Sequence, residues 1–122
     1  MLAERGGVSR TAFLEFLNNS VMGSTFTRYK SPAFIELDFS PTFTLPLLRK
    51  DFDLGLAAAR AMEVPMPVAA LCSQLVGGAI GAGYDDEDFA VLLLEQARAA
   101  GMKLEPEEAD VSDGLEQEEV AS

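Results

Sequence analysis

Histidine is absent from the 122 residues of this chain, and cysteine occurs once, at Cys72. Without histidine there is no imidazole to act as a general base and no zinc site of the His/Cys kind. A single cysteine cannot form a disulfide within the chain. We therefore exclude histidine-based catalysis and a disulfide scaffold, and we expect no metal.

Long apolar runs and basic residues are also scarce. No run approaches the roughly 18 apolar residues that a membrane-spanning helix needs, and residues 1–7 lack the apolar core of a signal peptide. Nine Lys and Arg stand against 20 Asp and Glu, a formal net charge of −11. Because apolar segments of these two kinds are missing, we expect a cytoplasmic protein that does not enter a membrane. Because an acidic chain repels phosphate, we expect it to bind no nucleic acid.

The acidic excess is concentrated at the C-terminal end. Residues 105–122 contain eight acidic residues and no basic residue, whereas residues 1–104 contain nine basic and twelve acidic residues. A segment this charged and this poor in apolar side chains cannot bury enough surface to fold by itself. We predict one helical domain over residues 1–104 and an acidic disordered tail over residues 105–122.

Strand and nucleotide-binding signals are missing as well. No stretch alternates apolar and polar residues over a strand's length, and no hairpin dipeptide separates two apolar runs. There is no P-loop and no G-x-G-x-x-G after a strand. The pattern predicts an all-α fold of about five packed helices joined by short loops.

Several residues mark helix boundaries. Ser9 and Ser24 are predicted N-caps, and Pro46 suits the first turn of a helix over residues 45–62. The acidic run at residues 85–88 lacks the ligand spacing of a calcium loop, so we interpret it as the cap of the last helix.

Two features interrupt otherwise helical spacing. Pro32 lies inside the pattern of residues 23–38, and we expect a break there because proline removes a hydrogen bond and clashes with the preceding turn. Gly77 and Gly78 lie inside the regular amphipathic pattern of residues 68–80. We expect them to allow a close helix crossing.

The segment at residues 45–62, LPLLRKDFDLGLAAARAM, is apolar on two sides when read as a helix. The first stripe is Leu45, Leu48, Phe52, Leu56 and Ala59, and the second is Leu47, Leu54, Ala57 and Ala61, with Lys50 among them. Such a helix normally packs between two partners. Lys50 then either meets an anion, a dipole or a ligand, or lies along apolar surface with its ammonium in water.

Four segments, in this order, resemble one protein family. They are LDFSPTF at 37–43, KDFDLGLA at 50–57, VPMP at 64–67 and GYDDEDF at 83–89. On these motifs, residues 2–102 resemble the C-terminal helical domain of the β-hydroxyacid dehydrogenases. This family includes 3-hydroxyisobutyrate dehydrogenase, tartronate semialdehyde reductase and glyoxylate reductase, and it is related to 6-phosphogluconate dehydrogenase.

The resemblance implies a two-part enzyme. A Rossmann domain binds NAD or NADP, and the helical domain closes the active-site cleft and makes most of the dimer contacts. Residues 1–5 align with the end of the helix whose start carries the family's catalytic lysine, so we expect that lysine upstream of Met1 and no catalytic residue here. By the same resemblance, Lys50 contacts the nicotinamide end of the cofactor, while Phe43 and Asp51 line the substrate side.

The resemblance leads to one main hypothesis. The chain would be the C-terminal substrate and dimerisation domain of an NAD(P)-dependent oxidoreductase acting on a small hydroxyacid, as a gene fragment or as half of a split enzyme. It should not catalyse alone. Its expected partners are a second copy or a separate Rossmann domain. The alternative is a non-enzymatic helical interaction or dimerisation module that uses the second stripe of residues 45–62.

Overall fold

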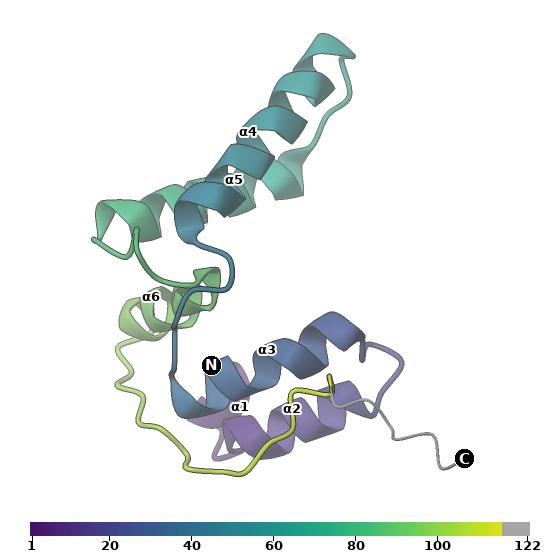
Figure 1. Ribbon diagram of the computed structural model, residues 1–122. Coiled ribbons are helices and arrows are strands. Elements are labelled where there is room, and N and C mark those ends of the chain that lie inside the picture. Colours follow the sequence, from purple (N-terminus) through teal and green to yellow (C-terminus); the bar gives the residue numbers. More distant parts are fainter. Residues whose placement is uncertain (116–122) are drawn as a thin grey trace. The chain divides into compact units, whose positions relative to one another are not determined.

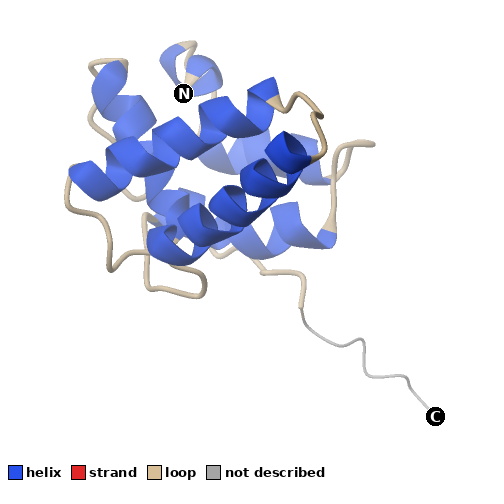
Figure 2. Ribbon diagram, turned by 90° about the horizontal axis from the view of Figure 1, so that it is seen from above, coloured by secondary structure: helices blue, strands red, loops and turns tan. Residues whose placement is uncertain are grey.

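A computed structural model describes residues 1–115 of the chain. Its helices are α1 (Leu2–Arg5), α2 (Arg10–Asn18), α3 (Thr25–Glu36), α4 (Leu45–Ala61), α5 (Pro67–Gly81) and α6 (Leu92–Ala99), with a 3-10 turn, η1 (Phe89–Val91), directly before α6. Figures 1 and 2 show helices and loops, and no strand, in this described part. The predicted all-α fold is confirmed.

The chain forms two compact units, which we describe separately. Unit 1 contains residues 1–38 and the described residues from 97 onward, and unit 2 contains residues 39–96. The division falls within α6. No helix in the described range is long and apolar enough to cross a membrane.

Unit 1 is built on the packing of α2 against α3. Both helices begin at the predicted caps, because the Ser9 hydroxyl accepts from the Ala12 amide at 3.1 Å and the Ser24 hydroxyl accepts from the Thr27 amide at 3.1 Å. The Thr27 hydroxyl in turn accepts from the Ser24 amide at 2.8 Å, which completes a capping box. These bonds satisfy amides that a helix start leaves free.

The break predicted at Pro32 is wrong, because α3 continues through this residue. Neighbouring side chains hold the helix together on either side of the proline. Fully buried Ser31 donates to the Thr27 carbonyl at 2.7 Å and accepts from Asn18 of α2 at 2.9 Å. Ile35, one turn later, is also buried. Packing on α2 thus outweighs the local cost of proline.

Unit 2 contains a hairpin of α4 and α5, which lie side by side in Figure 1. Pro46 occupies the first turn of α4 as predicted, and Pro67 begins α5. The first stripe of α4 is its packed side, because Leu45 is fully buried and the other four residues of the stripe are half-buried. The buried side of α5 is narrower and consists of Val76 and Ala79.

The close crossing predicted at Gly77 and Gly78 is wrong within the described chain. A Cβ atom built on either glycine would meet nothing within 4 Å. Part of the apolar pattern of α5 also remains in solvent, since Val68, Leu71 and Leu75 are 72, 62 and 55 % exposed. Helical periodicity identified an apolar face here, but it could not show whether a neighbour covers that face.

The C-terminal segment follows α6 without further helix. Leu104 is buried, and residues 105–115 contain neither helix nor strand. The segment nevertheless contacts α3, because the Glu107 amide donates to the Ile35 carbonyl at 3.1 Å. Residues 116–122, the end of the predicted tail, lie outside the described residues, and the domain boundary at residue 104 stays a prediction.

Candidate functional site

Lys50 is the sixth residue of α4 and lies on its solvent side. Its side chain is 59 % exposed, and its Nζ is 2.8 Å from Asp51 Oδ1. The second stripe around it is also in solvent, with Leu47 and Leu54 45 and 64 % exposed. In this chain Lys50 is therefore a surface cation, and its charge stays accessible to a ligand or a partner.

A hollow of about 550 Å³ lies beside Lys50, between α4 and the end of α5. It is lined by Pro46, Arg49, Lys50, Asp53, Leu54, Ile80 and Asp85. Arg49 and Asp53 form an exposed ion pair at 3.9 Å, one helical turn apart. The lining thus carries two cations and two carboxylates around apolar side chains, an arrangement that can contact a polar ligand from one side.

Phe43 lies two residues before α4 and is not part of this hollow. Its ring meets Phe89 edge-on, with ring centroids 6.2 Å apart. Its carbonyl accepts from the Phe89 amide at 3.0 Å. The structure therefore brings Lys50 and Asp51 together as an ion pair but places Phe43 on a different, aromatic contact.

Asp88 holds the chain that carries Phe43. Its side chain is 1 % exposed, and its Oδ2 accepts from the Thr42 amide, the Thr42 hydroxyl and the Phe43 amide at 3.1, 2.8 and 3.0 Å. Its Oδ1 accepts from the Ala90 amide at 3.0 Å and so caps η1. The sequence pattern indicated a cap in this acidic run, but gave no sign of the second attachment to residues 42–43.

Among the described residues, the groups that could contact a cofactor would do so from one side. They include no group of three or more His, Cys, Asp or Glu placed to hold a metal ion. Dinucleotide pyrophosphate is usually held by a glycine-rich turn between a strand and a helix, and the described part of the chain has no strand. Lys50 offers an exposed ammonium beside an open hollow, which suits a single charged contact.

Comparison with known proteins identifies the family of this helical chain. A family model described as "NAD-binding of NADP-dependent 3-hydroxyisobutyrate dehydrogenase" matches residues 1–102. The chain belongs to this family.

Individual relatives are longer than this chain. Cytokine-like nuclear factor N-PAC of Aedes aegypti is 32 % identical over 91 residues, which is 75 % of this chain and 16 % of that protein. Glyoxylate/succinic semialdehyde reductase 1 of Arabidopsis thaliana is 30 % identical over 93 residues, 76 % of this chain and 32 % of that protein. The chain thus spans about a third or less of these relatives.

A solved structure shares the fold. The crystal structure of 3-hydroxyisobutyrate dehydrogenase from Salmonella typhimurium superimposes with a TM-score of 0.70 at 24 % sequence identity, over 76 % of this chain and 33 % of that chain. At this identity the match supports the helical fold alone.

Proposed function

We propose that this chain is the C-terminal helical domain of an NAD(P)-dependent β-hydroxyacid dehydrogenase that acts on a small hydroxyacid. The observation that carries the proposal is the family match over residues 1–102, which contains the K-D pair of α4. Exposure of Lys50 on the side of α4 away from the packed stripe supports it, because the ammonium is free to meet a ligand held by another domain.

Three side chains have separate tasks in this proposal. Lys50 places a positive charge at the nicotinamide end of the cofactor, and Asp51, whose carboxylate is 2.8 Å from that ammonium, lines the substrate side. Phe43, held by Asp88 and Phe89, provides an apolar wall on the substrate side. When bound, the nicotinamide supplies the hydride chemistry. The general acid/base of the family is a different lysine, and none of Lys50, Asp51 and Phe43 takes that role.

Two measurements test this proposal. Calorimetric titration of the chain with NAD and with NADP should give no saturable heat, because no pyrophosphate-binding turn is present in the described residues. The chain joined to the Rossmann domain and first long helix of a relative should reduce NAD or NADP in the presence of a small hydroxyacid. Micromolar binding by the isolated chain, or a well-folded joined protein that binds cofactor but turns over no hydroxyacid, would contradict the proposal.

We also propose that the exposed face of α5 is covered by a second copy of the chain. Leu71 and Leu75, four residues apart on one helical face, are both more than half exposed. Exposed apolar patches of this kind mark interaction surfaces. A separate Rossmann domain that covered the same face would instead be seen as binding of that domain to a monomeric chain.

Sedimentation of the chain over a concentration series tests this second proposal. We expect association at about 100 μM, and Leu71→Gln with Leu75→Gln should shift the chain toward monomer. Val21→Gln is the matched control, because Val21 is fully exposed in unit 1. A monomer at every concentration, or an equal shift by the control, would contradict the self-association.

A further inference from the structure

The first turn of α2 is closed by a side chain from far along the sequence. Helix N-termini leave free amides that attract anions. Here the amides of Arg10 and Thr11 donate to the two carboxylate oxygens of Glu107 at 2.7 and 2.8 Å, and the Thr11 hydroxyl adds a bond of 2.6 Å. Ser9 satisfies only the next amide, that of Ala12. Glu107 therefore completes a cap that the local sequence leaves unfinished.

The side chain of Arg10 extends this anion site. It is 6 % exposed, and its Nε is 3.9 Å from Glu107 Oε1. The guanidinium also donates to the carboxylate of Glu4 and to the carbonyls of Phe34, Ile35 and Glu105. Two helix amides and a buried guanidinium thus converge on one position, and the carboxylate of Glu107 occupies it.

The rest of the segment is attached through few other contacts. The amides of Glu107 and Ala109 donate to the Ile35 carbonyl and to Glu36 Oε1, at 3.1 and 2.8 Å. Between residues 104 and 115, Leu104 is the buried apolar side chain. Because little apolar surface is buried, the attachment depends mainly on the carboxylate of Glu107, with a further bond from the Arg10 guanidinium to the Glu105 carbonyl.

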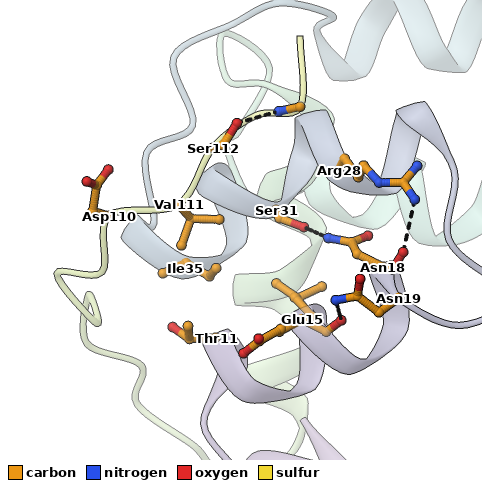
Figure 3. A pocket seen from close by; sticks show the side chains of 12 residues that line it. Thr11, Glu15, Asn18, Asn19, Arg28, Ser31, Ile35, Asp110, Val111 and Ser112 are labelled. Atoms are coloured by element: carbon orange, nitrogen blue, oxygen red, sulfur yellow. Dashed lines mark hydrogen bonds between the residues drawn. The ribbon is translucent and has the colours of Figure 1, made fainter. Parts of the chain in front are cut away.

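Beyond Glu107 the segment forms one wall of a hollow of about 500 Å³ between α2 and α3. Figure 3 shows Asp110, Val111 and Ser112 on one side of this hollow, with Asn18 and Ser31 on the helices across from them. The helix side is preformed, since Asn18 and Ser31 are bonded to each other at 2.9 Å. Movement of the segment alone would therefore open the hollow.

We propose that the N-terminus of α2 and Arg10 form a carboxylate-docking site, and that residues 104–115 are a detachable strap held there by Glu107. When it is docked, the strap forms one wall of the hollow between α2 and α3. This inference is independent of the dehydrogenase function, because the family match ends at residue 102 and Glu107 lies beyond it.

Acid should release the strap. Burial by itself raises the pKa of Glu107, but hydrogen bonds from Thr11 and the Arg10 amide, with the Arg10 charge, outweigh it and hold the pKa below its ordinary value. A carboxyl with a lowered pKa stabilises the docked state above its undocked pKa, and the effect is lost as the pH falls through the lowered pKa. The other charged groups that contact the docking site or the strap are Glu4, Arg10 and Glu36.

Amide hydrogen exchange of the full chain, followed residue by residue by NMR, tests the strap. In Glu107→Gln the amides of Glu107 and Ala109 should exchange about 10- to 100-fold faster, the factor expected for losing charge-assisted hydrogen bonds. Glu108→Gln is the matched control, because Glu108 is the exposed neighbour, and it should exchange as the wild type does. Acidification should release the strap in the wild type at a pH step that Glu107→Gln lacks.

Two outcomes would overturn the proposal. If Glu107→Gln leaves the exchange of the Ala109 amide unchanged, the carboxylate does not hold the strap. If Glu107→Gln removes protection throughout α2 and α3 as well, Glu107 is a permanent part of the fold of unit 1 and the strap does not detach. Helix content by circular dichroism, measured on the same samples, separates this second outcome from release of the strap alone.

Discussion

In each of the two units a buried charged side chain joins several segments, Arg10 in unit 1 and Asp88 in unit 2, and these two charges have opposite signs. Lys30 of α3 is a second buried cation of unit 1. In unit 1 the guanidinium of Arg10 donates to the Glu4 carboxylate of α1 and to carbonyls of α3 and the C-terminal segment. In unit 2 the carboxylate of Asp88 accepts from two backbone amides of residues 42–43 and from the Ala90 amide. The cation joins segments nearly 100 residues apart, whereas the anion shapes one loop and the start of one helix.

The comparison teaches where each unit is vulnerable. A buried ion pair contributes little net stability, but removal of one partner leaves the other charge buried and unpaired. Unit 1 therefore depends on Arg10 as a junction of four segments. In unit 2 the packing of α4 on α5 does not involve Asp88, so loss of Asp88 should disturb a loop more than the hairpin.

The largest effect is expected from Arg10→Met, which keeps the length of the stem and removes the charge. It should lower the free energy of unfolding of unit 1 by about 3–5 kcal/mol, since Glu4 and Glu107 would then lack their cation. Native-state hydrogen exchange of α2 and α3 measures this loss. Arg28→Met is the control, because Arg28 is exposed and its guanidinium donates to the Asn18 carbonyl at 3.0 Å, and its cost should not exceed about 1 kcal/mol.

Asp88→Asn should have the next largest effect. One side-chain oxygen would become an NH₂ group that faces amide donors, so we expect a loss of about 2–3 kcal/mol at residues 42–43 and η1. Exchange of the Phe43 and Ala90 amides would report it. Asp86→Asn, at an exposed position of the same acidic run, should change neither amide. Equal exchange in both variants would mean that Asp88 does not hold this loop.

The two faces of α5 offer a third test. Val76→Ala removes methyl groups from a side chain that is 1 % exposed and should cost about 2 kcal/mol. Leu75→Ala, one residue earlier and 55 % exposed, should cost about 0.5 kcal/mol or less in the monomer. Urea denaturation at a concentration where the chain is monomeric compares the two. Similar losses would show that Leu75 is buried in solution, which would contradict its 55 % exposure.

The sequence predicted the parts of this fold that depend on neighbours along the chain. The caps at Ser9 and Ser24 and the early proline of α4 are local signals, and the structure confirms them. The continuity of α3 through Pro32 depends on packing against α2, so local propensity gave the wrong answer. The residue spacing of α5 correctly predicts a helix. Spacing alone does not show whether a neighbour covers the apolar face, so the exposure of that face could not be predicted.

The two organising charges were missed for a related reason. Arg10 has its partners near residues 4, 34 and 105, and no local pattern contains that set. Asp88 lies in an acidic run that is typical of a helix cap, and nothing in that run indicates its hydrogen bonds to residues 42–43. Lys50 is indicated by its place in the second stripe of residues 45–62, whereas Phe43 and the roles of Lys50 and Asp51 come from the resemblance, and all three roles stay predictions.

The smallest effect on stability is expected at Lys50. Its partner Asp51 is also half exposed, and exposed ion pairs contribute little. Lys50→Met should therefore change the free energy of unfolding by less than about 0.5 kcal/mol. A loss of several times that amount in thermal or urea denaturation would make Lys50 a structural residue.

The same substitution gives the most direct test of the proposed site. In the chain joined to a relative's Rossmann domain, Lys50→Met should lower turnover per bound cofactor about tenfold or more, the usual scale for removing a positioned charge beside a reacting centre. Arg60→Met, at an exposed cation in the last turn of α4 and outside the hollow beside Lys50, should retain turnover close to the wild type. Equal turnover in wild type and Lys50→Met at saturating cofactor and substrate would contradict the assignment of Lys50 to the cofactor.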